Sequence, residues 1–409
     1  MRIMTVNGKR LWNSLMDMAQ TGASIGGGSN RVELTDEDKE GRELFIGWCR
    51  QDGFDVSIDA MGNIFARYGE ADHDLPPVVV GSHLDTQPRG GRFDGVYGVL
   101  AGLELIRTLK ENGVKTRRPI DVAVWTNEEG SRFNQPMLGS RFFTGRCTLE
   151  EARAFRDAAG ISVGEELNRL GYEGTADRAA LGVSTYVEVH IEQGPILYQT
   201  GQQIGVVLGV NGISGFDINL EGATCHAATT PIPMRRDALL GAARIIDQVH
   251  SLGASLEPNG RASSASLRVT PNVHNVVAGT VSMKADVRHR YPDSLREAET
   301  KLQDIVHDTA RQTGLSVEMT QYGRSEPIQF DLEAAGIVRD VVGHLGYSHV
   351  DIMSGAGHDA CNLSFFAPTI MIFIPCKDGL SHNEAEWTEP EDAERGCNVL
   401  LNSVLKFAN

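Results

Sequence analysis

Short apolar runs that end in polar clusters recur in the first half of the chain. A Val-rich run at 78–83 ends in His83, and an alternating apolar run at 120–125 leads into Glu128. Between these runs, residues 96–109 carry apolar side chains at helical spacing. A strand, helix, strand order is typical of a parallel α/β sheet, in which the carboxyl ends of the strands meet at one edge. We therefore expect an α/β fold with its site along that edge.

The same pattern continues with a helical stretch at 149–180 and a strand at 185–191 that carries His190. It resumes after residue 331, with a helix to 346, an apolar strand at 369–374 and a closing helix at 390–407. These elements predict one α/β sheet assembled from two distant parts of the chain.

The middle of the chain has a different rhythm. Its expected elements are strand 213–221, helix 237–252, strands 264–270 and 277–287, helix 294–313 and strand 315–321. A β-α-β-β-α-β order is typical of a split βαβ unit. We therefore expect an inserted domain at 211–327 that interrupts a discontinuous domain made of residues 1–210 and 328–409.

Composition narrows the choice of partners. The 409 residues include 38 Lys plus Arg and 54 Asp plus Glu, which leaves a formal charge of −16. This charge repels nucleic acid and anionic membranes unless a local basic patch overrides it, and the sequence has no such patch. The longest apolar stretches, at 96–106 and 367–375, are shorter than the roughly 20 residues that span a bilayer. We expect neither a nucleic-acid nor a membrane partner.

The chain start and the cysteines bear on location. Residues 1–10 are not followed by the apolar segment and cleavage site of a signal peptide. The six cysteines are scattered and form no C-x-x-C pair, so the sequence indicates neither a disulfide framework nor a cysteine zinc cluster. We expect a cytoplasmic protein.

The polar groups near the strand ends share one property, because imidazole and carboxylate groups are all able to bind a metal ion. They are His83, Asp85, Asp94, Glu128, Glu129, His190 and His382. Zinc, manganese, nickel and cobalt accept such ligands, and the absence of thiolates favours an open catalytic site over a closed structural one. Two ions about 3.5 to 4 Å apart need a bridging carboxylate and a free one that accepts a proton. Asp94 and Glu128 suit these two tasks.

Each of these residues alone is better explained as a surface or capping residue, but together they favour a metal site. The segments that begin at Gly81 (GSHLDT) and Gly90 (GGRFDG) put two potential ligands around a turn. Glu128 and Glu129 are adjacent like charges, which is unfavourable unless cations offset it. Consecutive strand residues point to opposite faces, so both acids reach one site only if the strand ends before them. We expect the strand to end there.

Several motifs together resemble the hydantoinase/carbamoylase branch of the M20 metallopeptidase family. They begin at Gly81 (GSHLDTQP), Gly91 (GRFDGVYGVLAG), Thr126 (TNEEGSRF), His190 (HIEQGP), Ser354 (SGAGHDA) and Gly379 (GLSHN). The resemblance covers nearly the whole chain. It implies a zinc-exopeptidase-like catalytic domain with a mostly parallel sheet, and an inserted ferredoxin-like α+β lid and dimerisation domain. The branch includes N-carbamoyl-L-amino acid hydrolases, β-ureidopropionases and allantoate amidohydrolases.

The resemblance also assigns metal ligands. It implies that His83 and His190 hold one divalent ion, that Glu129 and His382 hold a second, and that Asp94 bridges them. Zinc is the first choice, with manganese, nickel or cobalt as alternatives.

Catalytic and substrate-binding roles follow from the same resemblance. Glu128 is implied as the general base and Asp85 as the acceptor of the far N–H of His83. His226 matches a lid histidine that acts across the interface of a homodimer. The residues implied to contact a carboxylate-bearing substrate are Gln193, His226, Asn275, Arg288, Gly357 and His358. The segment around His226 departs from the family pattern at two positions, Ala228 and Ile232. These differences bear on which substrate the protein prefers.

The expected activity is hydrolysis of the carbamoyl C–N bond of a small N-carbamoyl amino acid, L-α or β, to the amino acid, ammonia and carbon dioxide. The alternatives within the same chemistry are an allantoate amidohydrolase and an aminoacylase or dipeptidase. From a different class, the chain fits a metal-dependent binding protein that has lost turnover.

Overall fold

The computed structural model describes residues 3–69 and 75–409, and these form two compact units. Unit 1 comprises Met1–Leu208 and Gln329–Asn409, and unit 2 comprises Gly209–Ile328. The first two residues of the chain start, on which the expectation of no signal peptide partly rests, lie outside the described residues. That the units act as a catalytic domain and as a lid and dimerisation domain stays a prediction.

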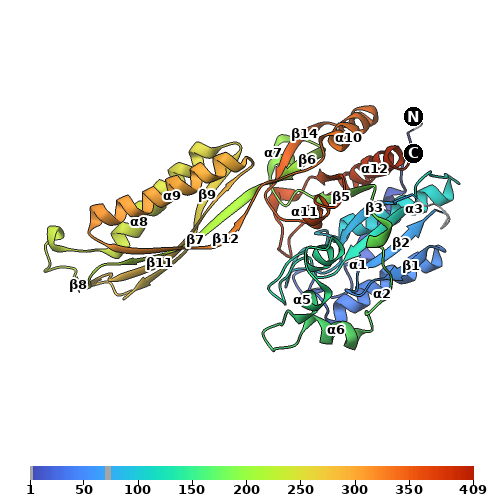
Figure 1. The fold of residues 1–409 in the computed structure, drawn as a ribbon. Coiled ribbons are helices and arrows are strands. Elements are labelled where there is room, and N and C mark those ends of the chain that lie inside the picture. Colours follow the sequence, from blue (N-terminus) through green and yellow to red (C-terminus); the bar gives the residue numbers. More distant parts are fainter. Residues whose placement is uncertain (1–2, 70–74) are drawn as a thin grey trace. The chain divides into compact units, whose positions relative to one another are not determined.

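A mixed sheet forms the centre of unit 1 (Figure 1). Its order is β1 (Asp55–Ile58), β2 (Ile64–Tyr68), β4 (Ile120–Trp125), β3 (Val78–His83), β5 (Thr185–Ile191), β15 (Thr369–Ile374), β6 (Ile204–Val210) and β13 (Ile328–Gln329), with β14 (His349–Ser354) also paired to β6. The central strands β4, β3, β5 and β15 are mutually parallel. This confirms the prediction of an α/β fold with a mostly parallel central sheet.

Every residue of these four central strands is buried. Strands that are covered on both faces are apolar along nearly their whole length. This explains why the sequence predicts these strands clearly. Their bounds match the predicted ranges, and polar residues follow at their carboxyl ends.

The longer helices of unit 1 pack on this sheet and on one another. They are α1 (Gly8–Met18), α2 (Asp36–Gln51), α3 (Val96–Glu111), α10 (Leu332–Leu345) and α12 (Pro390–Phe407). Helix α3 contacts β3, and α12 contacts both α1 and α3. Shorter helices are α4 (Leu138–Phe143), α7 (Ile196–Thr200), α11 (Asp359–Leu363) and the 3-10 turn η3 (Lys377–Gly379).

The prediction of a helical stretch over 149–180 is wrong. The segment contains α5 (Leu149–Ala154), α6 (Val163–Leu170) and the 3-10 turn η1 (Ala179–Leu181), separated by irregular chain. Thr148 and Ser162 each begin a new helix with a capping box, and Gly171 ends α6 in the left-handed conformation. Caps therefore divide a sequence whose apolar spacing alone favours one helix.

A buried ion pair lies within α2, and its arginine connects this helix to the chain that follows β4. Arg42 Nε donates to Asp38 Oδ2 at 2.8 Å, and both side chains are inaccessible to solvent. Arg42 Nη1 also donates to the carbonyl of Gly62 at 2.9 Å and to Thr126 Oγ1 at 3.2 Å. The pair thus supports the chain just before Glu128.

Replacing Arg42 with methionine leaves the Asp38 carboxylate buried without its cation. We expect Arg42→Met to lower the free energy of unfolding by about 3–5 kcal/mol, measured by urea unfolding. The control is Lys39→Met on the same helix, whose pair with Glu43 is solvent-exposed and whose loss changes stability by about 0.5 kcal/mol or less. Equal effects of the two variants would contradict this account.

Unit 2 is a four-stranded antiparallel sheet with two helices on one face (Figure 1). Its strands run in the order β12 (Ser316–Ser325), β7 (Gly212–Glu221), β11 (Thr280–His289) and β9 (Gly260–Thr270), and its helices are α8 (Ala238–Leu256) and α9 (Pro292–Thr313). Apolar residues of β7 and β11, including Ile218 and Met283, pack against Ile245 and Leu302 of the helices. The chain order is β-α-β-β-α-β, and β11 lies between β7 and β9, as in a split βαβ unit.

Unit 2 also contains short elements that the sequence pattern did not predict. Strand β8 (Cys225–His226) pairs with β10 (Val276–Val277), and the 3-10 turn η2 (Ile232–Met234) lies nearby in sequence. In the described part of the chain, no helix is long and apolar enough to cross a membrane.

Candidate metal centre

Five of the predicted metal ligands lie together in unit 1. His83 ends β3, Glu129 follows β4, His190 lies in β5 and His382 follows η3, while Asp94 comes just before α3. They form two groups of potential ligands, one with His83 and His190 and the other with Glu129 and His382. Asp94 belongs to both groups.

The two oxygens of Asp94 face different groups. Oδ1 lies 3.2 Å from His190 Nε2 and 3.7 Å from His83 Nε2. Oδ2 lies 3.3 Å from His382 Nε2, which is in turn 3.5 Å from Glu129 Oε2. One carboxylate therefore connects the two groups.

These separations fit divalent ions. Zinc bonds nitrogen and oxygen at about 2.0–2.1 Å, so two of its tetrahedral ligands lie about 3.3 Å apart. The distances around Asp94 range from 3.2 to 3.7 Å, close to the edges of such a tetrahedron. The residues present therefore fit one ion in each group.

Backbone carbonyls orient the two buried imidazoles. His83 Nδ1 lies 2.8 Å from the carbonyl of Asp85, and His190 Nδ1 lies 2.9 Å from that of Ile191. With its Nδ1 proton directed to the carbonyl of Asp85, His83 presents the lone pair of Nε2 to the site, whereas His190 Nε2 accepts the N–H of Gly95 at 3.0 Å. Asp85 was predicted to accept the far N–H of His83, and the atom of Asp85 that lies beside His83 Nδ1 is its carbonyl oxygen. The Asp85 carboxylate accepts the backbone N–H of Glu129 at 3.1 Å.

Left-handed backbone concentrates around these residues. Asn127, Gln193 and His382 have φ values of 57°, 55° and 53°, which are unfavourable for residues with a Cβ. Asn127 turns the chain after β4, so the strand ends before Glu128 as predicted. Gly95, at φ 68°, lies so close to the ring of His83 that a Cβ would overlap it. Several turns are thus held in conformations that serve the site.

Burial and crowding of acids shift the pKa values here. Burial and then the charge of Asp94 raise the pKa of Glu129 to about 8. Burial, followed by the charges of Asp359 and Glu129, raises the pKa of Glu128 well above its usual range. Divalent cations would offset this repulsion. Burial lowers the pKa of His83 to about 4, which favours the neutral, metal-binding imidazole.

Comparison with known proteins gives the family. The model for peptidase family M20/M25/M40 matches residues 79–406. The chain belongs to this family. The family is metal-dependent, in agreement with the clustered ligands.

Individual relatives show to which branch of the family this chain is similar. An N-carbamoyl-L-amino-acid amidohydrolase of Rhizobium meliloti is 43% identical over 98% of this chain and 97% of its own length. An allantoate amidohydrolase of Bacillus subtilis (strain 168) is 31% identical, over 97% of this chain and 98% of its own. The structure of a hydantoinase/carbamoylase family amidase from Burkholderia multivorans is 46% identical, with a TM-score of 0.97 over 99% of this chain and 98% of that one. The predicted resemblance to this branch of the M20 family is confirmed.

Two further predicted residues of this M20 chain lie beside the ligands. Gln193 Nε2 donates to Asp94 Oδ2 at 2.7 Å, while its Oε1 is buried and has no hydrogen-bond partner among the described residues. His358 follows Gly357, is buried, and places Nε2 2.9 Å from Ser354 Oγ. Its ring centroid is 4.7 Å from that of His190. Their roles in substrate binding stay predictions.

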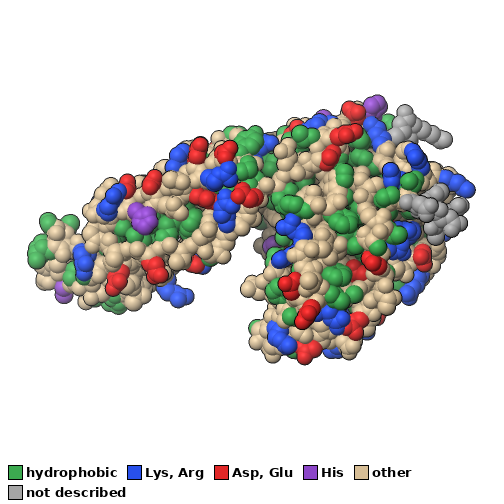
Figure 2. All heavy atoms as spheres, viewed as in Figure 1, with side chains coloured by type: hydrophobic (Ala, Val, Ile, Leu, Met, Phe, Trp, Pro, Cys, Tyr) green, Lys and Arg blue, Asp and Glu red, His purple; other side chains and the backbone are tan. Residues whose placement is uncertain are grey.

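The other three predicted residues lie in unit 2. The pairing of β8 with β10 puts His226 beside Asn275, whose carbonyl accepts the N–H of Ala227 at 3.0 Å. His226 Nδ1 accepts the N–H of Ala228 at 3.1 Å, so Nε2 carries the ring proton of the neutral side chain. Arg288 lies on β11, and its Nε donates to Asp286 at 3.1 Å. Figure 2 shows hydrophobic side chains gathered at the β8 end of this unit.

Sequence reasoning missed several residues that touch the ligands. Gln87 donates to both oxygens of Glu129, at 3.1 Å from its N–H and 2.8 Å from its side chain. Ser381 and Glu386 contact Asp94 or its backbone. Gln87 and Ser381 lie in the motifs that begin at Gly81 and Gly379, and Glu386 follows the second of these motifs. These positions do not distinguish them from ordinary loop residues.

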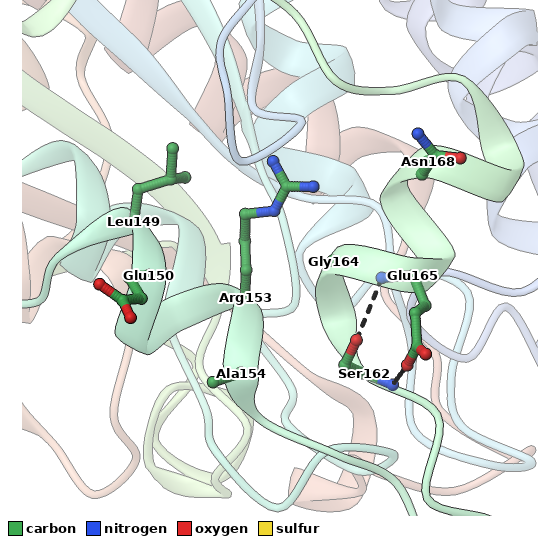
Figure 3. A pocket seen from close by; sticks show the side chains of 8 residues that line it. All are labelled: Leu149, Glu150, Arg153, Ala154, Ser162, Gly164, Glu165 and Asn168. Atoms are coloured by element: carbon green, nitrogen blue, oxygen red, sulfur yellow. Dashed lines mark hydrogen bonds between the residues drawn. The ribbon is translucent and has the colours of Figure 1, made fainter.

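A surface hollow of about 790 Å³ between α5 and α6 is separate from this centre (Figure 3). Several of its polar lining residues are already paired, because Arg153 bonds to Glu173 and Glu165 closes the capping box of Ser162. The hollow contains none of the predicted site residues.

We predict that divalent metal stabilises the folded protein through Asp94. At a free zinc concentration 100 times the dissociation constant, the free energy of unfolding should rise by about 2.7 kcal/mol for each ion bound, measured by thermal unfolding after treatment with a chelator. Asp94→Ala should abolish most of this rise, because both ligand groups lose their shared member. The control is Asp121→Asn on β4, a buried acid paired with Arg67, which should keep the metal-induced rise. An unchanged rise in Asp94→Ala would refute the site.

Proposed function

We propose that this chain is a metal-dependent amidohydrolase that cleaves the carbamoyl C–N bond of an N-carbamoyl-L-amino acid and releases the amino acid, ammonia and carbon dioxide. The observation that carries the proposal is the position of Asp94, with one ligand group at each oxygen and Glu128 beside them. Glu128 Oε2 lies 3.5 Å from His83 Nε2. The substrate class is supported by the 43% identical relative, which is named for this activity and matches over nearly the whole chain.

Two divalent ions, with zinc as our first choice, would be held by His83, His190, Glu129, His382 and the shared Asp94. Such ions polarise a carbonyl oxygen and lower the pKa of bound water. Glu128 takes the proton of the attacking water at its carboxylate and passes it to the departing nitrogen. Asp85 keeps His83 and Glu129 in place through its carbonyl and its carboxylate.

The substrate contacts form a second part of the proposal. The unpartnered Oε1 of Gln193 is an acceptor for the carbamoyl NH₂ group. His226 donates a hydrogen bond from its Nε2–H to the carbamoyl oxygen. In our proposal it serves the metal centre of the partner subunit in a homodimer. Arg288 and Asn275 bind the substrate carboxylate, since a guanidinium fork suits a planar anion.

The loop that contains Gly357 and His358 supplies further substrate contacts in this proposal. His358 is fully buried against His190, and burial is the main cause that keeps its pKa well below the usual value. A neutral His358 adds no cationic charge beside the metal ligands. The cytoplasmic location stays a prediction.

The proposal is tested with a substrate panel. Purified protein loaded with zinc, manganese, nickel or cobalt is given N-carbamoyl-L-α-amino acids, N-carbamoyl-β-alanine, allantoate and dipeptides, and ammonia or amino acid release is measured. We expect the highest kcat/KM on an N-carbamoyl-L-α-amino acid. Preference for allantoate, which is supported by the 31% identical relative of that name, would replace the substrate assignment. Metal binding without turnover of any substrate would contradict the enzymatic function.

Glu128→Gln tests the proton transfer. The amide keeps the size of the side chain but does not accept a proton at neutral pH, so kcat should fall by about 10²- to 10⁴-fold. Metal content, measured by elemental analysis, should stay at the wild-type level because Glu128 is not among the proposed ligands. Wild-type kcat in this variant would overturn its role as the base.

Arg288→Lys tests carboxylate recognition. We expect kcat/KM to fall about 10- to 100-fold, which corresponds to a lost charge-assisted hydrogen bond of about 1.5–3 kcal/mol. The matched control is Arg261→Lys, because Arg261 lies opposite Arg288 on β9 and pairs with Glu257. If the two variants behave alike, or if Arg288→Lys loses no preference for the acid over its neutral amide, the assignment is wrong.

A further inference from the structure

Glu386 is a buried acid on the loop after His382 whose contacts converge on Asp94. Its side chain is almost fully buried, with 2% of its surface exposed. One oxygen, Oε1, accepts the backbone N–H of Phe93 at 2.9 Å and that of Asp94 at 3.1 Å. These segments are 292 positions apart in the sequence.

The second oxygen of Glu386 reaches the carboxylate of Asp94 through one side chain. Ser381 Oγ lies 3.0 Å from Glu386 Oε2 and 3.0 Å from Asp94 Oδ2. Glu386 also donates its own N–H to the carbonyl of Asn383 at 3.0 Å, which closes the turn that directly follows His382. Glu386 therefore contacts the backbone of Asp94, a neighbour of its carboxylate, and the loop that carries His382.

Gly91 lies against the carboxylate of Glu386. A Cβ on Gly91 would overlap the carboxylate of Glu386, and Gly91 does not have a positive φ. The steric demand at Gly91 therefore comes from Glu386 rather than from the local backbone conformation.

We propose that Glu386 is a positioning residue that fixes Asp94 between the two ligand groups. Asp94 serves both groups only if its two oxygens point in opposite directions, which requires its backbone and its side-chain torsions to be held. One Glu386 oxygen holds the backbone, and the other lies against Ser381 Oγ and so keeps this hydroxyl within hydrogen-bond distance of the Asp94 carboxylate. This inference rests on the proposed metal-dependent function, and it concerns metal affinity rather than the substrate.

The segments that Glu386 joins are also packed together by aromatic rings. Trp387 contacts Phe93 with ring centroids 5.7 Å apart, and both contact Trp12. This cluster keeps residues 93 and 387 together when the acid is removed, so we expect Glu386→Ala to fold.

The test measures metal binding to chelator-treated protein by titration calorimetry with zinc, in the absence of substrate. Glu386→Ala should weaken zinc binding about 10- to 100-fold. Glu386→Gln should stay within about threefold of wild type, because the amide oxygen accepts both N–H groups while its NH₂ donates to Ser381. The control Glu384→Gln removes a charge from the same loop, where Glu384 pairs with Arg89, and should bind zinc as wild type does.

The Gly91→Ala variant provides an independent test of the role of Glu386. Its methyl group displaces the Glu386 carboxylate, so alone it should weaken zinc binding as Glu386→Ala does, whereas the double variant should be no weaker than Glu386→Ala. Wild-type affinity in Glu386→Ala, an equal loss in Glu386→Gln, or additive losses in the double variant would each overturn the proposal.

Circular dichroism of the metal-free variants checks folding. If Glu386→Ala does not fold, tight binding by Glu386→Gln together with weak binding by Gly91→Ala supports the proposal, and wild-type binding by both overturns it. Because zinc affinity is measured without substrate, the zinc affinities of the variants can be interpreted even if the protein cleaves no substrate in the panel.

Discussion

The carboxylate of Asp94 is the interaction on which the rest of the site depends. Its two oxygens lie 3.2 Å from His190 and 3.3 Å from His382, residues that are far apart in the sequence. A single side chain can serve two ions only when both of its oxygens are held in fixed directions. Much of the surrounding structure has the effect of holding them, from the Gly95 turn that begins α3 to the buried Glu386.

Holding these groups together has physical costs that the fold offsets elsewhere. Three acids, Asp94, Glu128 and Glu129, lie close together and largely out of water, which is unfavourable without cations. Non-glycine residues in the left-handed region, such as Asn127 and His382, add backbone strain. The parallel strands, buried on both faces, provide the rigid support that keeps these conformations in place.

The sequence predicted those elements whose patterns have one physical interpretation. Strands β3, β4, β5 and β15 are fully buried runs bounded by chain-breaking or polar residues, and their predicted bounds are correct. The prediction of one helical stretch at 149–180 was wrong. Its apolar spacing favours one helix, but the caps at Thr148 and Ser162 divide the segment.

The candidate ligands were predictable because each lies in a motif of a known family. Glu386 was not, since it resembles Glu384 in sequence although one is buried and the other pairs with Arg89 at the surface. What separates them is contact with residues 93 and 94, which depends on folding across 292 positions. The Asp85 carbonyl that meets His83 has no signal in the sequence, because every residue has a carbonyl.

The most direct measurement is a crystal structure of the protein grown with zinc, with anomalous scattering recorded at both sides of the zinc absorption edge. The account predicts two anomalous peaks about 3.5 to 4 Å apart, one beside each oxygen of Asp94. A single peak, or peaks at a site that excludes Asp94, would contradict it.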